Sequence, residues 1–287
     1  MKHTVKTAAL LLAIFALASC ERELSAEEKA ARFTYPDKSG EAEVLYNEGD
    51  TLTDGDFTFT VDPNGDLTLT EYRGIDTTVI IPEKSEGMRV TAVGDGVFAE
   101  NSTLTTVEFS RYVTEIGDRA FFNCVNLLRI LGTDNVKYVG AHAFTGTAAA
   151  SYSDKEFVTV GSDILVAYKG QGGAVTVPEG IRIISTAFAG REGITEIKLP
   201  RSLKYIGSSA FEICCDLVSI DVPGGTVAIG DRAFAGCAAL TDIYIPFDVS
   251  ELGENIFDEC SGALEVLCMA GSHAESYCLE HGICIKE

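Results

Sequence analysis

The sequence predicts a mainly β fold with short helical turns, a solenoid in which about seven units of 23 residues stack to form a parallel sheet. Three observations lead to this fold class. A phenylalanine recurs along the 287-residue chain in steps of 23, 23, 44, 23, 23 and 23 residues. Most of these phenylalanines follow a glycine by four residues, and strand-like segments that end in proline follow the later ones. The recurring residues are Phe98, Phe121, Phe144, Phe188, Phe211, Phe234 and Phe257.

The first twenty residues, MKHTVKTAALLLAIFALASC, have the pattern of a secretion signal. Lysines precede an apolar run, 8–18, that is too short to remain as a membrane span. The ending Leu17-Ala18-Ser19-Cys20 resembles the bacterial lipobox, which implies that residues 1–20 are a lipoprotein signal peptide and that Cys20 becomes the lipidated first residue. The following Glu21-Arg22-Glu23 is similar to the acidic export signal of surface lipoproteins in Bacteroides-like bacteria. We therefore expect a lipid-anchored protein of the bacterial cell envelope, at the outer-membrane surface.

Residues 21–49 are predicted to be a tether, and residues 50–88 an N-terminal β-hairpin cap. In the cap, Asn64-Gly65 suits a tight turn between two alternating segments. Asp62, Asn64 and Asp66 also have the spacing that begins a calcium loop. Such a loop requires a glycine at its sixth position and a distal glutamate, and both are lacking, so the hairpin is the preferred interpretation.

Residues 89–270 are predicted to form the solenoid, with the unit V-x-x-I-G-x-x-A-F-x-x-C-x-x-L-x-x-I-x-I-P. One unit is too short to bury its own apolar face, so neighbouring units must stack. The segment L-x-x-I-x-I alternates like a strand, and proline ends it because proline cannot donate to a ladder. Seven such strands at ~4.8 Å spacing predict one parallel sheet on the order of 30 Å long. The last unit has an extra residue, and its inward positions are interpreted as Leu264 and Leu267.

This unit resembles the bacterial surface leucine-rich repeat of the BspA type, also called the Treponema pallidum type. The resemblance covers about residues 50–287 and recurs seven times. It implies a leucine-rich-repeat solenoid. It also implies adhesion, because relatives of this type are associated with binding to host matrix proteins and to other bacteria.

Two further segments differ from the unit. Residues 150–180 fill the step of 44 and read as short strands around glycine turns, which predicts a hairpin inserted into the solenoid. A related pattern occupies 56–82. Residues 271–287 are predicted to be a C-terminal helical cap, in which Ser272 and Glu275 form a capping box, Gly282 ends the helix and ICIKE returns as a strand.

The charge balance limits the partners that the protein can bind. The chain has 22 basic and 43 acidic residues, a formal net charge of −21. Binding to nucleic acid or to an anionic membrane surface needs clustered lysine and arginine, so nucleic acid is not an expected partner. The only membrane contact that we expect is the lipid anchor. The hydrophobic share of 46% is enough to form a core.

The cysteines are interpreted as packing residues rather than as reactive groups. Four of them share one column of the repeat, where other units have asparagine, threonine or arginine, and we expect reduced, buried thiols there. This column contains Cys124, Cys214, Cys237 and Cys260, with Asn101, Thr147 and Arg191 in the other units. Near the C-terminus, a disulfide joining two of Cys268, Cys278 and Cys284 is an alternative, and zinc binding with His273 and His281 is a third. Cys268 is expected to point outward.

No catalytic constellation is recognisable in the sequence. The histidines beyond the signal peptide are His142, His273 and His281, and none has a recognisable nucleophile as a partner. We therefore predict that the protein is not an enzyme and that it has no cofactor and no metal site.

The remaining candidate is the outward face of the solenoid sheet, which repeat proteins commonly use for binding. Outward side chains occupy alternate positions of each L-x-x-I-x-I segment, and aromatic and arginine residues among them are the better anchors. The candidate binding residues are Thr106, Glu108, Arg129, Leu131, Glu196, Lys198, Asp221, Asp242 and Tyr244. An ordinary solvated sheet face is the alternative that the sequence leaves open.

Three functions are consistent with this pattern. The first is an adhesin-like surface lipoprotein that binds a host matrix protein, a glycan or another bacterium. The second is a structural envelope protein without a specific ligand. The third is an extracellular enzyme acting on glycans, although no motif identifies the carboxylate pair that it would need.

Overall fold

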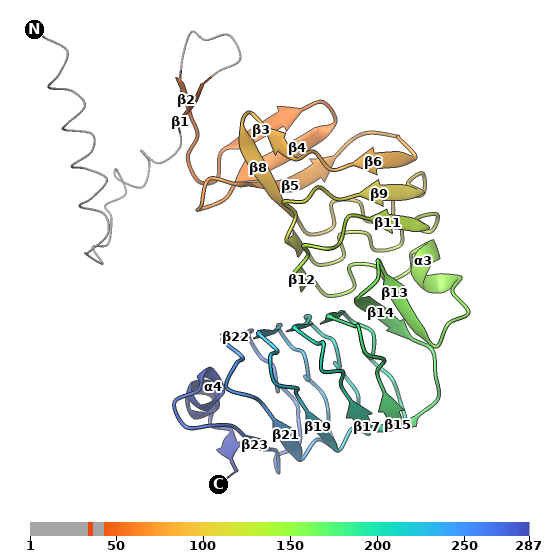
Figure 1. The fold of residues 1–287 in the computed structure, drawn as a ribbon, viewed down its shortest axis with the longest axis vertical. Coiled ribbons are helices and arrows are strands. Elements are labelled where there is room, and N and C mark those ends of the chain that lie inside the picture. Colours follow the sequence, from red (N-terminus) through yellow and green to blue (C-terminus); the bar gives the residue numbers. More distant parts are fainter. Residues whose placement is uncertain (1–33, 37–42, 287) are drawn as a thin grey trace, which may run out of the picture.

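The computed structural model describes residues 34–36 and 43–286, and these form two solenoids that meet end to end at an angle (Figure 1). The predicted signal peptide and the predicted lipidation site Cys20 lie outside the described residues. Within the segment predicted to be a tether, β1 (Thr34–Pro36) and β2 (Glu43–Leu45) pair in an antiparallel hairpin.

The N-terminal solenoid contains two sheets. In the repeat units one sheet takes two-residue strands and the other takes three-residue strands, and we call them the short-strand sheet and the long-strand sheet. Four further strands, nearer the N-terminus, extend the short-strand sheet and have four to six residues. The short-strand sheet has the order β12-β10-β8-β5-β4-β3, with β7 beside β8, and the long-strand sheet has the order β11-β9-β6. The bounds are β3 (Thr51–Asp54), β4 (Phe57–Val61), β5 (Leu67–Tyr72), β6 (Thr78–Ile80), β7 (Lys84–Ser85), β8 (Met88–Val93), β9 (Thr106–Glu108), β10 (Glu115–Ile116), β11 (Arg129–Leu131) and β12 (Tyr138–Val139). The helix α3 (Ala148–Ser151) follows.

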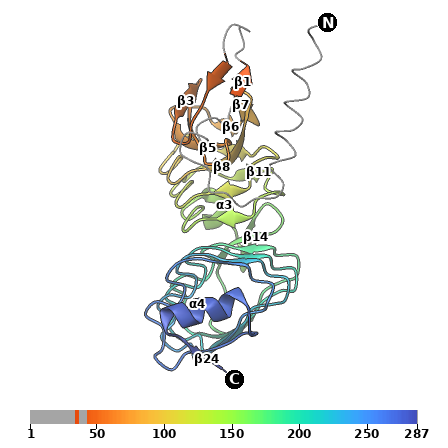
Figure 2. The same cartoon turned by 90° about the vertical axis from the view of Figure 1, so that its left-hand side faces the viewer.

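The C-terminal solenoid has the same two-sheet arrangement. Its short-strand sheet has the order β13-β14-β16-β18-β20-β22, and its long-strand sheet has the order β15-β17-β19-β21-β23-β24. The bounds are β13 (Phe157–Val160), β14 (Ile164–Tyr168), β15 (Gly173–Thr176), β16 (Ile183–Ile184), β17 (Ile194–Lys198), β18 (Tyr205–Ile206), β19 (Ser219–Asp221), β20 (Ala228–Ile229), β21 (Asp242–Tyr244), β22 (Glu251–Leu252), β23 (Glu265–Leu267) and β24 (Cys284–Ile285). The helix α4 (His273–His281) lies across its far end (Figure 2). The predicted fold class, a mainly β repeat solenoid with parallel sheets, is confirmed.

The predicted single sheet of seven strands is wrong, because the long-strand sheet is interrupted between β11 and β15. After Phe144 the chain forms α3 at the positions that lead into the long strand in the preceding units, and no strand follows at 152–154. Thr147 is the N-cap, and its side chain accepts a hydrogen bond from the backbone N–H of Ala150. β11 is therefore the last strand of the N-terminal long-strand sheet.

The hairpin β13–β14 has the same architecture as the N-terminal cap. In the N-terminal cap, β4 and β5 form an antiparallel hairpin, β5 pairs in parallel with β8, and β6 begins the long-strand sheet. In the inserted segment, β13 and β14 form the hairpin, β14 pairs in parallel with β16, and β15 begins the long-strand sheet. The aromatic residues correspond: Phe57 contacts Tyr72 at 5.2 Å between ring centroids, and Phe157 contacts Tyr168 at 5.1 Å. The inserted segment is therefore a second N-terminal cap, on which a second solenoid begins.

This second cap also closes the first solenoid. Alternate side chains of a strand point to opposite faces of its sheet. Val158, Val160 and Ile164 pack into the N-terminal core, whereas Leu165 and Tyr168 pack into the C-terminal core. The two solenoids thus share one hairpin, and no open linker separates them (Figure 1).

The recurring phenylalanines form the spine of both cores. Their rings stack at centroid separations such as 5.0 Å for Phe98–Phe121 and 5.1 Å for Phe211–Phe234, and both members of the second pair are fully buried. Offset stacking at such distances is a favourable arrangement of aromatic rings. The stack stops at Phe144 and begins again at Phe157, which is where the two solenoids meet.

Candidate functional site

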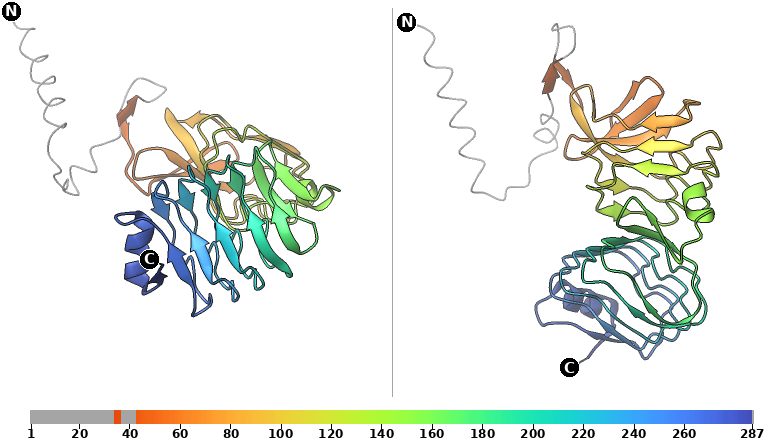
Figure 3. Two further views of the ribbon diagram at one scale, coloured as in Figure 1. Left: turned by 60° about the horizontal axis from the view of Figure 1, so that its bottom comes forward. Right: turned by 45° about the vertical axis from the view of Figure 1, so that its right-hand side comes forward.

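The candidate binding surface is built on the C-terminal long-strand sheet. In its strands, Ile197, Ile220, Ile243 and Val266 point inward and are at most 2% exposed. The residues on either side of each must therefore point outward, because side chains alternate along a strand. We call these outward side chains, together with Lys286 directly after β24, the C-terminal face. They are Glu196, Lys198, Ser219, Asp221, Asp242, Tyr244, Glu265, Leu267 and Lys286. Figure 3 shows the strands that carry them side by side.

Two shallow depressions occur on this face. One, of about 330 Å³, lies between β17 and β19 and is lined by Glu196, Lys198 and Asp221 among others. The other, of about 180 Å³, lies between β19 and β23 around Tyr244 and Leu267. Asp221 lines both depressions, so the two are neighbours on one surface.

The charges of this face are partly paired. The Lys286 ammonium donates a hydrogen bond to the Asp242 carboxylate and lies 3.9 Å from that of Glu265. The hydrogen bond from Lys286 holds the pKa of Asp242 below its ordinary value, and a hydrogen bond from Thr241 lowers this pKa by a smaller amount. The same contact raises the pKa of Lys286. Tyr244 is half-buried beside this charged group, with an apolar ring and a hydroxyl available to a partner.

The nine predicted binding residues fall into two groups that the structure does not bring together. Glu196, Lys198, Asp221, Asp242 and Tyr244 lie on the C-terminal face. Thr106, Glu108, Arg129 and Leu131 lie on the N-terminal long-strand sheet. All nine positions lie next to an inward residue as the pattern requires, but the break after β11 separates the groups.

The N-terminal group carries less charge and more apolar surface. Leu131 is 38% exposed and shares a column with Ile80, which is 62% exposed, through the pairing of β11, β9 and β6. Glu108 lies between them in that column, and Arg129 is also exposed. The two depressions described above lie over the C-terminal strands and not over these ones.

The predicted register of the last unit is wrong by one residue. Val266 pairs with Ile243 and is fully buried, whereas Leu267 pairs with Tyr244 and is 42% exposed. The extra residue is therefore absorbed before β23 and does not shift the strand. Leu267 replaces Cys268 in the outward column, and Cys268 is half-buried rather than outward. Glu265 and Leu267 are therefore absent from the predicted set, although counting nine residues from Phe257 identifies Val266 as the inward residue. Lys286 lies after α4, outside the repeat, and has no such signal.

The cysteine column has a structural role. Each thiol donates to the carbonyl of the phenylalanine in the preceding unit, for example Cys124 to Phe98 at 2.9 Å and Cys237 to Phe211 at 3.2 Å. Burial raises the pKa of Cys124 to about 11 and that of Cys214 to about 12. A thiol that stays protonated at neutral pH is a poor nucleophile.

The C-terminal cysteines are also unpaired. All eight cysteines of the described region are free, so the alternative disulfide among Cys268, Cys278 and Cys284 is not formed. Within the same region, no group of three or more His, Cys, Asp or Glu side chains has a geometry that could hold a metal ion. The ring of His281 instead stacks on Tyr277 at 4.0 Å between centroids.

The turn at Asp62 is a hairpin loop. The Asp62 carboxylate accepts hydrogen bonds from the backbone N–H groups of Asn64 and Asp66, at 2.7 and 2.9 Å. This carboxylate therefore closes the loop between β4 and β5. Across residues 34–36 and 43–286, no helix combines the length and the apolar character that a membrane span requires.

Comparison with known proteins identifies the repeat. The family model described as the BspA type leucine rich repeat region matches six copies, over residues 77–153 and 170–280. No curated protein matches the chain in sequence.

Several solved structures match this chain. The leucine rich repeat protein of T. pallidum shares 24% identity over 75% of this chain and 91% of its own, with a TM-score of 0.39. A leucine rich cell surface protein from Faecalibacterium prausnitzii shares 23% identity over 78% of this chain and 77% of its own, with a TM-score of 0.37. The pneumococcal vaccine antigen PcpA shares 14% identity over 78% of this chain and 82% of its own, with a TM-score of 0.39.

Proposed function

Since the chain belongs to the BspA type leucine-rich repeat family, we propose that it is a lipid-anchored cell-surface protein that binds a macromolecular partner through the C-terminal face. The observation that carries this proposal is the pair of adjoining depressions around Asp221 and Tyr244. A tyrosine beside paired and unpaired charges combines apolar contact area with polar groups that can fix the orientation of a partner.

The partner is a surface protein or glycan, such as a host matrix component or a molecule on another bacterium. The acidic balance of the chain supports this class over nucleic acid, because phosphate binding needs clustered basic residues. Membrane attachment is through Cys20, at the outer-membrane surface. The face has room for an extended contact, since its strands lie side by side over four repeats and the closing strand.

The proposal is tested by binding of the purified protein to an immobilised panel of extracellular-matrix proteins and glycans. Changing Tyr244 to Ala is expected to weaken binding of a captured partner by about 30-fold or more, which is the size of a hot-spot effect. Asp221→Lys reverses one exposed charge on the same face and is expected to weaken binding without disturbing the core.

Arg129→Ala is the matched comparison, because Arg129 is an exposed side chain on the other long-strand sheet. If only the Arg129→Ala variant loses binding, the binding site lies on the N-terminal long-strand sheet instead of the C-terminal face. Unchanged binding in all three variants would reject the sheet face as the binding surface. Thermal unfolding of each variant distinguishes lost binding from lost folding.

A further inference from the structure

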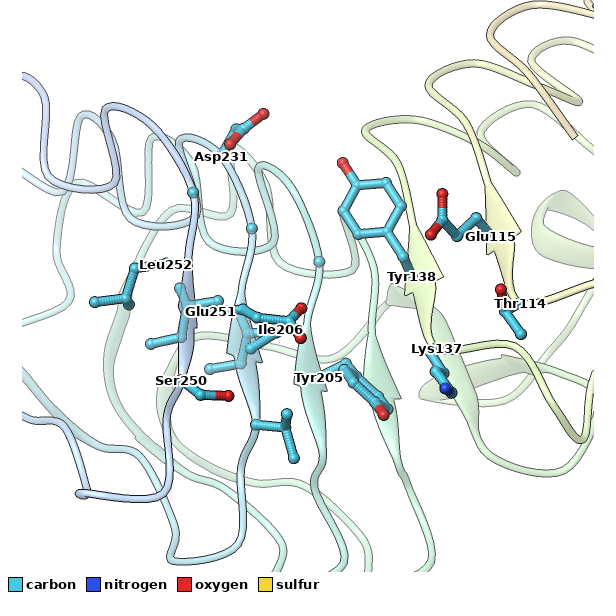
Figure 4. Close-up of a pocket in the computed structure, with 16 residues that line it drawn as sticks. Thr114, Glu115, Lys137, Tyr138, Tyr205, Ile206, Asp231, Ser250, Glu251 and Leu252 are labelled. Carbon is cyan, nitrogen blue, oxygen red and sulfur yellow. The ribbon is translucent and has the colours of Figure 1, made fainter. Parts of the chain in front are cut away.

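A second surface, separate from the C-terminal face, lies in the angle between the two solenoids. It is a cleft of about 760 Å³ whose walls belong to different solenoids (Figure 4). One wall is formed by β10 and β12, and the other by β18, β20 and β22. Ligand-binding pockets in proteins have volumes of this order.

The two walls are held in place by direct contacts at the closed end of the cleft. The Tyr138 hydroxyl lies 2.6 Å from the Ser208 hydroxyl, and the Arg182 guanidinium donates to the Val136 carbonyl at 2.7 Å. Gly207 allows the backbones to come this close, since a Cβ there would lie 2.8 Å from the Val139 carbonyl oxygen. Together with the shared hairpin, these contacts give a cleft that is formed before any ligand binds.

Aromatic rings lie deep in the cleft, and charged groups lie on both walls. Tyr138 and Tyr205 project from β12 and β18, the two strands nearest the closed end. Glu115 and Glu251 are farther out on opposite walls, and Lys137 lies beside Tyr138 (Figure 4).

These charged side chains are available to a ligand. Among the described residues, the carboxylates of Glu115 and Glu251 and the ammonium of Lys137 have no hydrogen bond and no ion pair, and all three side chains are exposed. The apolar part of the cleft is contributed by Val227, Ala228 and Leu252 of the second wall.

The rim of the cleft adds negative charge from both solenoids. Asp231 lines the cleft on the C-terminal side, and Asp118 follows β10 of the N-terminal wall by two residues. Burial raises the pKa of Asp118 although the Ala141 N–H opposes the shift, and the carboxylates of Asp95 and Asp231 raise it further. Asp118 and Asp231 are therefore close enough to repel each other across the boundary, which makes the rim a region that favours cations.

We propose that this cleft binds an extended, basic segment of a partner protein. A lysine or arginine side chain of the segment lies between Glu115 and Glu251, and its aliphatic or guanidinium part rests on the rings of Tyr138 and Tyr205. The cleft is lined by three carboxylates, those of Glu115, Asp231 and Glu251, and by one ammonium, that of Lys137. This excess of negative charge is complementary to a cation, and the face of a tyrosine ring also attracts a cationic group. Anionic glycans and phosphates would be repelled by the same groups, and a neutral glycan would leave the two opposed carboxylates without a charge partner.

The experiment measures fluorescence anisotropy of a short labelled peptide of alternating arginine and glycine, at physiological ionic strength. The full chain is expected to bind it, and a peptide with glutamine in place of arginine is expected to bind at least about tenfold more weakly. The double variant Glu115→Gln/Glu251→Gln is expected to weaken binding about tenfold. Lys137→Gln removes the only ammonium of the cleft lining and is expected to tighten binding about twofold.

The control is the double variant Glu108→Gln/Glu196→Gln, which removes the same charge from exposed strand positions on the two long-strand sheets. It is expected to bind the peptide within about twofold of the unaltered protein. Equal weakening by both double variants would overturn the proposal, because the binding would then reflect net charge alone. Absence of peptide binding, or tighter binding of a neutral cello-oligosaccharide in the cleft, would overturn it as well.

This test is independent of the function proposed for the C-terminal face. Tyr244→Ala changes that face and is expected to leave peptide binding unchanged. A negative peptide result therefore rejects the cleft without affecting the matrix-binding experiment.

Discussion

The turn around each repeat phenylalanine contains backbone conformations that favour glycine and asparagine. Two residues of the unit, the second before and the second after the phenylalanine, have left-handed backbone angles in successive units. Glycine occupies the later position in three units, and Asn123 occupies it in another with φ of 56°. Ile213 has φ of 60° at this position, and its side chain is 55% exposed. A β-branched residue in this region is strained.

We predict that Ile213→Asn raises the free energy of unfolding by about 1 kcal/mol, because asparagine tolerates left-handed angles and little buried area is lost. Urea denaturation measures the change. Val218→Asn is the control, since Val218 is also exposed, at 45%, but has no positive φ. The strain interpretation fails if Ile213→Asn is no more stable than the unaltered protein.

The cysteine column illustrates what one residue position can reveal in a repeat sequence. Variation among cysteine, asparagine and threonine indicated a packing role, and the thiol-to-carbonyl contacts of Cys124, Cys214, Cys237 and Cys260 agree with it. The particular acceptor, the phenylalanine carbonyl of the preceding unit, was not predictable because it depends on how the units stack.

At the scale of elements, the terminal helix shows how a local signal identifies a cap. Ser272 is the N-cap of α4, and its hydroxyl accepts a hydrogen bond from the Glu275 N–H at 3.1 Å. The Glu275 side chain returns to the Gly271 N–H at 2.7 Å, one residue earlier than a capping box requires. Gly282 ends the helix with φ of 67°. The buried side chains Ala274 and Cys278 then dock α4 on the last repeat.

We predict that Ser272→Ala lowers the free energy of unfolding by about 1 kcal/mol, because it removes an N-cap acceptor from a buried position. Ser276→Ala is the control within the same helix, as Ser276 is exposed and its hydroxyl contacts only the Ser272 carbonyl at 3.4 Å. The control is expected to change the stability by less than about 0.5 kcal/mol. Equal effects of the two substitutions, measured by thermal unfolding, would contradict the capping role.

At the scale of the whole molecule, the second cap divides the chain into two solenoids that depend differently on the shared hairpin. The C-terminal solenoid contains its own starting hairpin, its repeats and its closing helix. The N-terminal solenoid ends at β12 and α3, and its core is completed by Val158, Val160, Ile164 and Val166 from the hairpin.

We predict that residues 154–287 alone fold with a cooperative thermal transition, whereas residues 43–153 alone do not, because that fragment leaves the end of its core open to water. Circular dichroism at low protein concentration is the measurement, since the isolated C-terminal part exposes the apolar face of the hairpin. Residues 43–185, which regain the hairpin, are the matched control and are expected to recover a cooperative transition. Cooperative folding of residues 43–153 would show that the hairpin is not needed to close the first core.

The sequence by itself determined the repeat and the inward and outward positions of its units before the last. These features arise from spacing within a unit and from contacts between neighbouring units about 23 residues apart, as between Glu196 and Ser219 or between Ile220 and Ile243. Only the tertiary structure decided where the sheet breaks, that Lys286 reaches Asp242, and that Tyr138 meets Ser208 across 70 residues. The contact between Tyr138 and Ser208 depends on the angle at which the two solenoids share one hairpin, and the contact between Lys286 and Asp242 depends on how the chain returns after α4. Neither feature has a periodic signal in the sequence.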